Sequence, residues 1–390
     1  MKPDALIDLV RAVYGEGDIP LHRPVFAGNE KQYLADCIDS NFVSSVGAKV
    51  TEFEQQCAKF TGMKYAVATV NGTAALHVAL LLAGVQRGDE VITQALSFIA
   101  TCNALSYAGA MPVFVDVDED TLGMSAVALS EFLRGNAVHK DGQCFNKVTG
   151  KRIAACVPMH TFGFPCRISE IATICAEWNI ALLEDAAESL GSYVADAHTG
   201  TFGQLATLSF NGNKLVTTGG GGMILTNDES TAKRAKHITT TAKIPHPYEF
   251  VHDDIGYNYR LPNLNAALGC AQMEQLSGFL DAKRGVAERY ENFFRDHGVT
   301  FIKARAGTTA NQWLNAIVLD SVAARDEFLT TTNKAGVMTR PIWRLMSHLE
   351  MYKGCQNDGL KVSQWLEQRV VNVPSSVPDV ARSVAIRYGG

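Results

Sequence analysis

Apolar residues recur at helical spacing in some segments of the chain and form short continuous runs in others. The first pattern predicts helices and the second predicts buried strands. Predicted helices lie at 50–60, 74–83, 100–107 and 168–178, and predicted strands at 65–70, 90–93, 112–117, 154–158 and 181–184. Because strands and helices alternate, the pattern predicts an α/β fold in which helices cover both faces of a mainly parallel sheet.

The pattern changes in two places. Residues 134–152 are rich in Gly, Asn, His and Lys, so we expect a surface insertion there. From about residue 265 a long helical stretch at 264–294 leads into shorter mixed elements, which indicates a smaller α+β domain. We therefore predict a large domain over residues 1–262, with an N-terminal extension and the insertion, and a small C-terminal domain over residues 263–390.

Composition narrows the class of protein. A chain of 390 residues with 47% hydrophobic and 19% charged residues is typical of a globular protein with two or three domains. The net charge of −5 and the lack of a Lys/Arg cluster argue against a nucleic-acid partner. Nine scattered cysteines without a C-x-x-C pair favour reduced thiols over a disulfide framework or a zinc site, so no metal is expected.

The sequence predicts neither a signal peptide nor a membrane span. Asp4 and Asp8 interrupt the N-terminal segment, where a signal peptide needs an apolar run. The longest apolar run, 74–85, contains His77 and is shorter than the roughly 18 residues that a span requires. We therefore expect a soluble, cytoplasmic protein without a membrane partner.

Lys214 lies between an apolar strand pattern that ends at Phe210 and the glycine run 219–222. A lysine in such a place cannot simply reach water, and burial disfavours the charged form of an amine. A neutral amine is the nucleophile that forms a Schiff base with a carbonyl group, which makes Lys214 a candidate catalytic residue. The alternative is a solvated surface charge, as for most of the 35 lysine and arginine residues.

Three further positions follow predicted strands, where ligands collect in open α/β sheets. Residues 71–74 (Asn-Gly-Thr-Ala) open a helix and suit a phosphate, although a plain helix cap is the alternative. Asp185 could bind a ribose hydroxyl, a metal or a protonated pyridine nitrogen, or merely cap the next helix. Phe98 could stack on a flat ring or belong to the core.

Taken together, these positions describe a single ligand. A phosphate would lie at Gly72 and Thr73, and a ring would stack on Phe98. The Asp185 carboxylate would hold a ring nitrogen protonated, and the Lys214 amine would reach an aldehyde. These are the parts of pyridoxal 5′-phosphate (PLP). A nicotinamide-dependent oxidoreductase, disfavoured by the missing G-x-G-x-x-G pattern, and a non-catalytic relative that keeps the fold are the alternatives.

Four motifs carry a resemblance to a known family: 72–77 (GTAALH), 184–188 (EDAAE), Ser209-Phe210 with Lys214 after them, and 256–260 (GYNYR). From about residue 20 to about residue 376 the chain resembles the DegT/DnrJ/EryC1 family of PLP-dependent nucleotide-sugar aminotransferases. The resemblance implies PLP fold type I, the fold of aspartate aminotransferase.

Segments 145–150, 158–163, 219–222 and 252–260 are most similar to one branch of that family. The branch aminates C4 of UDP-linked 2-acetamido-4-keto-6-deoxy sugars, on routes to bacillosamine and legionaminic acid. The resemblance therefore implies that L-glutamate donates an amino group to such a sugar. A GDP- or dTDP-linked 3- or 4-keto sugar is the alternative acceptor.

The resemblance also implies roles for the matched residues. Lys214 would form the Schiff base with the cofactor and move a proton between substrate and cofactor carbons, and Asp185 would hold the pyridine nitrogen protonated. Phe98 would stack on the ring, and Glu188 would lie near its 3′-oxygen. The cofactor phosphate would bind to the backbone or hydroxyl groups of Gly72, Thr73, Ala74 and Ser209.

Asn258 and, second to it, Arg260 would reach the phosphate in the neighbouring subunit, which implies a homodimer with shared active sites. His160 follows a predicted strand and is expected to contact the sugar, unless it is a histidine satisfied in the core. Arg340 with Trp343 would bind the glutamate carboxylate or the nucleotide diphosphate, unless they form a structural pair on an edge strand. Residues 44–47 (Ser-Ser-Val-Gly) would lie near the substrate entrance, unless they form a plain turn.

Overall fold

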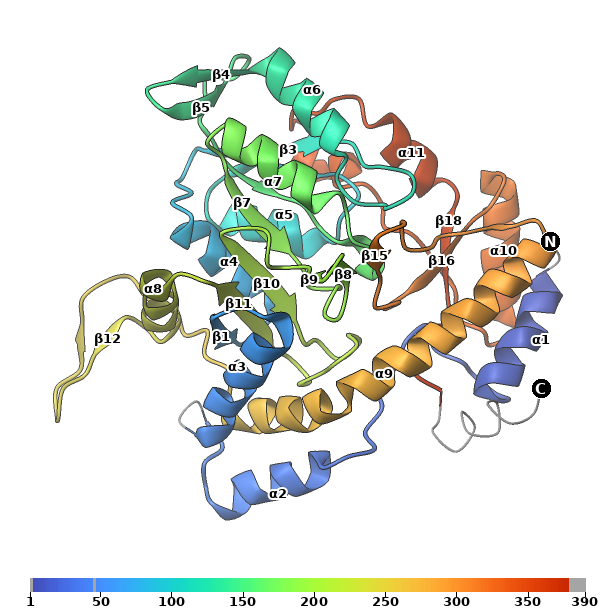
Figure 1. Cartoon of the computed structure of the whole chain (residues 1–390), viewed down its shortest axis with the longest axis horizontal. Coiled ribbons are helices and arrows are strands. Elements are labelled where there is room, and N and C mark those ends of the chain that lie inside the picture. The colour runs from blue at the N-terminus through green and yellow to red at the C-terminus, as the bar shows by residue number, and fades with distance from the viewer. Residues whose placement is uncertain (1–2, 45–46, 379–390) are drawn as a thin grey trace.

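The computed structural model of the chain describes residues 3–44 and 47–378. At its centre lies a seven-stranded sheet in the order β1-β11-β10-β7-β6-β2-β3 (Figure 1). Strands β10 to β3 in this order are parallel neighbours, whereas β11 runs antiparallel to both β1 and β10. The bounds are Tyr65–Thr69 (β1), Glu90–Gln94 (β2), Met111–Val115 (β3), Ile153–Val157 (β6), Ala181–Asp185 (β7), Leu205–Ser209 (β10) and Gly222–Thr226 (β11). The expected α/β fold with a mainly parallel sheet is confirmed.

Helices pack on both faces of this sheet. They are α3 (Ala48–Thr61), α4 (Gly72–Leu82), α5 (Ile99–Tyr107), α6 (Ala126–Asn136), α7 (Ile168–Glu177) and α8 (Glu229–Thr239). Successive side chains of a strand point to opposite faces, and the buried clusters follow this rule. Ile224 of β11 packs in the cluster of α4, α5 and α8, whereas its neighbours Met223 and Leu225 pack in the cluster that contains Phe53 of α3.

A second, four-stranded antiparallel sheet is formed by the C-terminal part of the chain, in the order β14-β16-β18-β17. Its strands are Thr300–Phe301 (β14), Asn315–Val318 (β16), Arg340–Pro341 (β17) and Val370–Val373 (β18). Helix α1 (Pro3–Tyr14) and α10 (Val322–Lys334) share a buried cluster with this sheet, so an N-terminal helix packs on the C-terminal sheet. The domain boundary between residues 262 and 263 stays a prediction.

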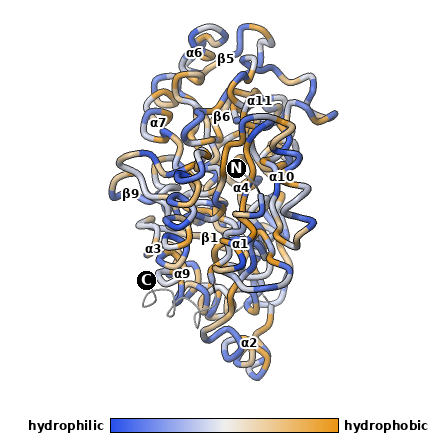
Figure 2. Tube along the Cα trace, turned by 90° about the vertical axis from the view of Figure 1, so that its right-hand side faces the viewer, coloured by the Kyte–Doolittle hydropathy of each residue, from blue (hydrophilic) through white to orange (hydrophobic). Residues whose placement is uncertain are grey.

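Helix α9 (Asn263–Asp296) connects the two sheets over 34 residues. It packs against α2 (Glu30–Asp39) and α3 near its start and against β14 near its end, and it crosses the molecule as one long helix in Figure 1. The hydropathy colouring in Figure 2 shows polar and apolar positions mixed along the helices, as expected where one side of each helix is buried. Among the described residues, no helix is long and apolar enough to cross a membrane.

Short elements decorate this frame. A hairpin of β12 and β13 extends away from the body beyond α8 (Figure 1). The remaining elements are β4 (Ala137–Lys140), β5 (Gln143–Asn146), β8 (Tyr193–Val194), β9 (Ala197–His198), β12 (Lys243–Ile244), β13 (Val251–His252), β15 (Thr308–Thr309), η1 (Thr161–Gly163), η2 (Met346–His348), η3 (Glu350–Tyr352) and α11 (Lys361–Glu367).

The elements predicted between residues 50 and 184 are all present, each within two residues at both ends. The long helix predicted at 264–294 is also confirmed as α9. The insertion expected at 134–152 contains a hairpin of β4 and β5 at the periphery of the molecule. Asn146 anchors that hairpin, because its side-chain amide donates to Glu90 at 2.7 Å and to Gln356 at 2.6 Å.

Two glycines of α9 provide a matched test of its packing. A Cβ added at Gly269 would lie 2.7 Å from the Phe53 ring and 2.8 Å from Thr218, whereas one added at Gly278 would meet nothing within 4 Å. We expect Gly269→Ala to lower the free energy of unfolding by about 1–3 kcal/mol through overpacking. Gly278→Ala should raise it by up to about 1 kcal/mol, because alanine favours a helix over glycine. Urea unfolding of both variants checks this, and a Gly269→Ala variant as stable as wild type contradicts it.

Candidate active site

A pocket of about 310 Å³ lies at the carboxyl ends of the parallel strands, where ligands bind in open α/β sheets. The turns after β1, β2, β7 and β10 contribute to it, and two tryptophans from the C-terminal part of the chain complete it. The lining residues are Asn71, Gly72, Thr73, Leu76, Phe98, Ala100, Thr101, Met159, Asp185, Ala187, Glu188, Ser209, Asn211, Asn213, Lys214, Trp313 and Trp343. The structure thus brings Lys214 together with most of the residues predicted to join it.

One wall of the pocket is the N-terminus of α4. Asn71 caps the helix, because its side-chain Oδ1 accepts the N–H of Ala74 at 2.8 Å. The Ala74 N–H is therefore already bonded within the protein, while Gly72 and Thr73 lie at the helix start, where N–H groups have no intrahelical partner. A Cβ on Gly72 would come within 2.9 Å of Ser209 Cβ. Gly72, Thr73 and the Ser209 hydroxyl consequently form a close cradle for an anion.

The glycine run 219–222 brings the Lys214 segment against this cradle. Gly219 adopts a φ of +78°, which favours glycine, and turns the chain back towards the sheet. Gly222 lies at the start of β11, where an added Cβ would be 2.4 Å from the carbonyl oxygen of Asn71 and 2.7 Å from the Gly72 nitrogen. The backbone of β11 therefore contacts the start of α4 directly.

Asp185 ends β7 at the floor of the pocket and is 5% exposed. Its Oδ2 accepts the Thr101 hydroxyl at 2.7 Å, and its Oδ1 accepts the Ala187 N–H at 3.2 Å. Burial raises the pKa of this carboxyl, and the Thr101 and Ala187 hydrogen bonds oppose that rise by stabilising the charged form. Both donors are neutral, so the negative charge of this buried carboxylate is not matched by a hydrogen-bonded cation. A protonated ring nitrogen of a ligand would supply that cation.

Lys214 is held between a carboxylate and an indole ring. Its Nζ donates to Glu188 Oε1 at 3.0 Å and lies 3.9 Å from the ring centroid of Trp313. The Lys214 side chain is 12% exposed and that of Glu188 is 1% exposed. Burial raises the pKa of Glu188 to about 7, although the nearby Lys214 charge lowers it. Lys214 is thus neither a surface lysine nor fully enclosed, and its amine opens into the pocket.

Aromatic side chains line the opposite side. Phe98 is the N-cap residue of α5 and is 48% exposed, with its ring centroid 6.0 Å from that of Trp343. Trp343 in turn packs on Phe162 at 4.8 Å. Phe98 and Trp343 therefore offer aromatic surface to a flat ligand, as predicted for Phe98.

His160 lies beneath the pocket and does not line it. The side chain is 0% exposed, its Nε2 is 3.0 Å from Glu184 Oε2, and its Nδ1 accepts the Cys166 N–H at 3.3 Å. Both ring nitrogens are thus engaged within the core. A sugar could not contact His160 without displacing these bonds. His160 is therefore placed as a core histidine with both ring nitrogens bonded, which was the alternative to a sugar contact.

Arg340 also lies away from the pocket. It is exposed on β17, and its Nη1 donates to Asn333 Oδ1 at 2.7 Å and to the Thr339 carbonyl oxygen at 2.9 Å. The structure therefore separates Arg340 from Trp343, which reaches the pocket. Of the predicted entrance turn, Ser44 and Gly47 are described, whereas Ser45 and Val46 lie outside the described residues.

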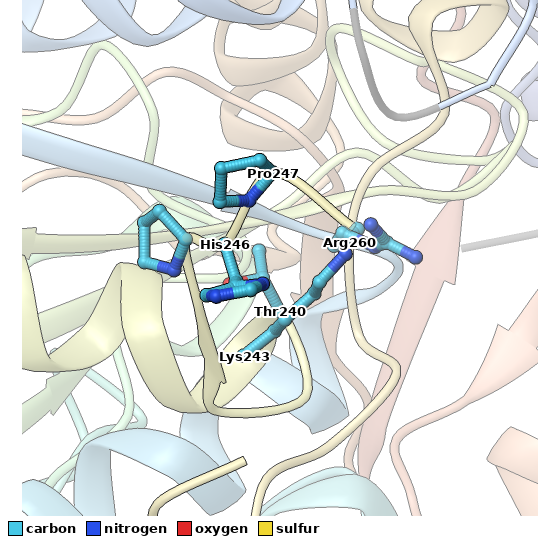
Figure 3. Close-up of a pocket in the computed structure, with 6 residues that line it drawn as sticks. Thr240, Lys243, His246, Pro247 and Arg260 are labelled. Carbon is cyan, nitrogen blue, oxygen red and sulfur yellow. The ribbon is translucent and has the colours of Figure 1, made fainter. Parts of the chain in front are cut away.

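Asn258 and Arg260 lie at the base of the β12–β13 hairpin and do not line the Lys214 pocket of their own chain. Arg260 pairs with Thr69 of β1 and Asn258 with Thr240. Arg260 lines a separate open pocket with Thr240, Lys243, His246 and Pro247 (Figure 3). These two residues are exposed, so they are available to a group outside their own subunit.

Two pocket residues have no clear signal in the sequence. Trp313 comes from a segment of short mixed elements that no motif marks, and its indole N–H donates to the Asn213 carbonyl oxygen at 2.8 Å. Thr101 lies on a predicted helix, three residues after Phe98. Residues at this spacing share one side of a helix, so its distance from Phe98 was the available sign that Thr101 faces the pocket. Within the described residues no cluster of three or more His, Cys, Asp or Glu side chains could hold a metal ion.

The pocket fits PLP. Gly72 has no side chain, and a Cβ there would collide with Ser209. The backbone N–H groups at the start of α4 are therefore open to a phosphate beside the Ser209 hydroxyl. The Asp185 carboxylate is buried and has only neutral donors among its hydrogen-bond partners in the described part of the chain, which suits a protonated pyridine nitrogen. Lys214 Nζ lines the same pocket and is placed to meet an aldehyde.

Comparisons with known proteins identify the family of the chain. The model of the DegT/DnrJ/EryC1/StrS aminotransferase family matches residues 25–383. A protein of Escherichia coli O157:H7 named GDP-perosamine synthase is 35% identical over 357 residues, which cover 92% of this chain and 93% of the relative. A putative pyridoxal phosphate-dependent aminotransferase, EpsN of Bacillus subtilis (strain 168), is 35% identical over 327 residues, or 84% and 81% of the two chains.

Solved structures have the same fold. The aminotransferase TlmJ from Streptoalloteichus hindustanus superimposes with a TM-score of 0.83 at 26% identity, over 91% of this chain and 93% of that chain. Fold and pocket together define a PLP-dependent aminotransferase of fold type I. The chain belongs to the DegT/DnrJ/EryC1/StrS aminotransferase family, and it is a PLP-dependent aminotransferase.

Proposed function

We propose that this enzyme transfers the amino group of L-glutamate to C4 of a GDP-linked 4-keto-6-deoxy sugar. The observation that carries the transfer is the meeting of Lys214, Asp185, Ser209 and the start of α4 in one pocket. The choice of nucleotide rests on the E. coli relative, whose name refers to a GDP-linked sugar and which matches nearly the whole chain. UDP, favoured by the branch motifs, becomes the alternative.

In this proposal each pocket residue has one task. The N–H groups of Gly72 and Thr73, with the Ser209 hydroxyl, bind the cofactor phosphate. Asp185 holds the pyridine nitrogen protonated, and bound PLP then supplies an electron sink for the carbon that bears the amine. Phe98 stacks on the ring and excludes water from one face.

Lys214 performs the proton transfer. Its Nζ would hold the cofactor covalently and would give way to the amino donor. As a free amine, Nζ would accept a proton from the donor carbon and donate it on the cofactor side. In the second half of the reaction the same Nζ carries a proton in the opposite sense, to C4 of the sugar. Trp313 and Glu188 confine the amine while it is free.

The role of Lys214 is tested by trapping it. Borohydride treatment of the yellow, PLP-loaded enzyme should link the cofactor covalently to Lys214, and peptide mass spectrometry should locate the adduct there. Lys214→Ala should form no adduct and should lose activity by at least about 10²–10⁴-fold, the usual contribution of a positioned acid–base group. Lys303→Ala, which removes an exposed lysine outside the pocket, is the control and should keep both properties. An adduct that persists in Lys214→Ala would refute the assignment.

The nucleotide is tested with a substrate panel. The enzyme is incubated with L-glutamate and with GDP-, UDP- or dTDP-linked 4-keto-6-deoxy sugars, and the amino-sugar product is followed by mass. We expect kcat/KM for the GDP-linked sugar to exceed the others by at least about tenfold, which corresponds to about 1.4 kcal/mol of transition-state binding. Preferential turnover of the UDP-linked sugar would contradict the choice of GDP and would support the UDP-sugar branch that the sequence motifs suggest.

We also propose that two copies of the chain share their active sites. The segment between β12 and β13 and the turn after it expose large apolar side chains, with Tyr248 and Phe250 each 81% and Ile255 78% exposed. Such side chains are typical of a surface that a partner covers. Asn258 and Arg260 follow in the chain, exposed and outside their own Lys214 pocket, so they are the candidates to bind the phosphate in the partner's site.

Subunit complementation tests this arrangement. Lys214→Ala and the double variant Asn258→Ala/Arg260→Ala should each be nearly inactive. Mixed and reassociated, they should form heterodimers in which one site has all native residues, and activity should return to about a quarter of wild type. A mixture that stays inactive while heterodimers are present would show that these residues serve the site of their own chain.

A further inference from the structure

His77 lies on α4, in the motif whose first residues form the anion cradle, but it does not line the Lys214 pocket. The His77 side chain is 5% exposed. Burial lowers the pKa of its imidazole, so the ring is neutral near pH 7 and one ring nitrogen can accept a hydrogen bond. The cradle uses the start of the motif 72–77 and leaves this histidine without a task.

Two tyrosines of the segment 256–260 close on the His77 ring. The ring centroid of Tyr257 lies 5.1 Å from that of His77, and the ring centroid of Tyr259 lies 6.0 Å from it, both edge to face. The two tyrosine rings stack on each other at 5.1 Å. The Tyr259 hydroxyl also lies 3.4 Å from His77 Nδ1 and can donate to it. We call these three side chains the aromatic clamp.

The backbone of the same segment is held between β1 and the end of α8. On one side, Val70, which follows β1, donates its N–H to the Tyr259 carbonyl oxygen at 2.8 Å. On the other side, Tyr257 donates its N–H to the Ile238 carbonyl oxygen at 2.6 Å. Tyr259 likewise donates its N–H to the Thr239 carbonyl oxygen at 3.0 Å. These bonds fix the direction of the segment, and the aromatic clamp fixes its side chains against α4.

The clamp also decides which side chains of the segment face outwards. Successive side chains of an extended segment point to opposite sides. Tyr257 and Tyr259 are half-buried against His77, whereas Asn258 and Arg260 between and after them are exposed. The two residues that a partner's site would receive are thus turned outwards because their neighbours are held inwards.

We propose that His77 is a positioning residue for the active site of the partner subunit. Its ring holds Tyr257 and Tyr259, which anchors the segment from which Asn258 and Arg260 reach out of their own subunit. Without this ring the segment gains conformational freedom, which must be lost again when it binds a phosphate in the partner's site. This inference rests on the proposed sharing of active sites between two copies of the chain.

The place of a His77→Ala substitution within a heterodimer tests this role. In the reference pair, the lending chain carries Lys214→Ala and the receiving chain carries Asn258→Ala/Arg260→Ala. The working site then combines the pocket of the receiving chain with Asn258 and Arg260 of the lending chain. On the lending chain, His77→Ala should lower activity at least about tenfold, the usual cost of weakened hydrogen bonds to a charged group. On the receiving chain, the same substitution should change activity by less than about twofold, because that chain lends nothing to the working site.

Cofactor binding supplies a second readout, because the borohydride adduct forms on the receiving chain, which carries Lys214. The PLP concentration that gives half of the maximal adduct is measured by peptide mass spectrometry. It should rise at least about tenfold with His77→Ala on the lending chain and stay unchanged with His77→Ala on the receiving chain. His139→Ala on the lending chain removes another histidine packed on an aromatic ring, that of Trp178 at 4.8 Å, and should change neither readout.

The outcomes are distinguishable. If His77→Ala is as harmful on the receiving chain as on the lending chain, His77 supports α4 of its own subunit and the positioning role is wrong. Tyr259→Ala removes the clamp from its other side, should also act only on the lending chain, and decides the matter if His77→Ala does not fold. An active reference pair that tolerates the clamp substitutions on both chains overturns this inference and leaves the shared site standing. A reference pair that forms but stays inactive overturns both.

Discussion

The close approach of β11 to the start of α4 is the constraint on which the site depends. Gly222 leaves no space for a side chain between the sheet and Asn71. The contact places the first turn of α4 beside Ser209, so backbone N–H groups and a hydroxyl converge on one point. It also fixes where the chain emerges from β10, and hence where Lys214 enters the pocket. A longer side chain at this position would separate the anion cradle from the lysine.

Two buried carboxylates in the same pocket differ because their partners differ. Asp185 receives hydrogen bonds from neutral groups, which stabilise its charge without neutralising it and leave it ready for a cationic ligand. Glu188 has a protein cation at 3.0 Å, so its charge is already matched. Burial raises both pKa values, but of the two carboxylates only Glu188 is hydrogen-bonded to Lys214. Similar residue types thus acquire distinct tasks through their neighbours.

The sequence was sufficient for the sheet and for the residues that follow its strands. Short apolar runs located β1, β2, β3, β6 and β7, and helical spacing located α3, α4, α5 and α7. Strand ends located Gly72, Phe98 and Asp185. The positions of His160 and Trp313 depend on tertiary packing, which the local sequence pattern does not show. His160 follows a strand like the others, yet the Glu184 carboxylate draws its ring into the core. Trp313 reaches Lys214 only because the C-terminal part of the chain folds back over the sheet, which no local pattern encodes.

The packing of α1 against β18 has a consequence for biosynthesis. The Tyr14 hydroxyl donates to the Pro374 carbonyl oxygen, 360 positions away, and the apolar side of α1 is buried in the same cluster as Val371. At ribosomal rates of about 5–20 residues per second, the first helix waits about 20–70 s for its partner strand to be made. During that interval its apolar side is open to other chains. The cluster that buries α1 is therefore completed only when the last of the described strands has been made.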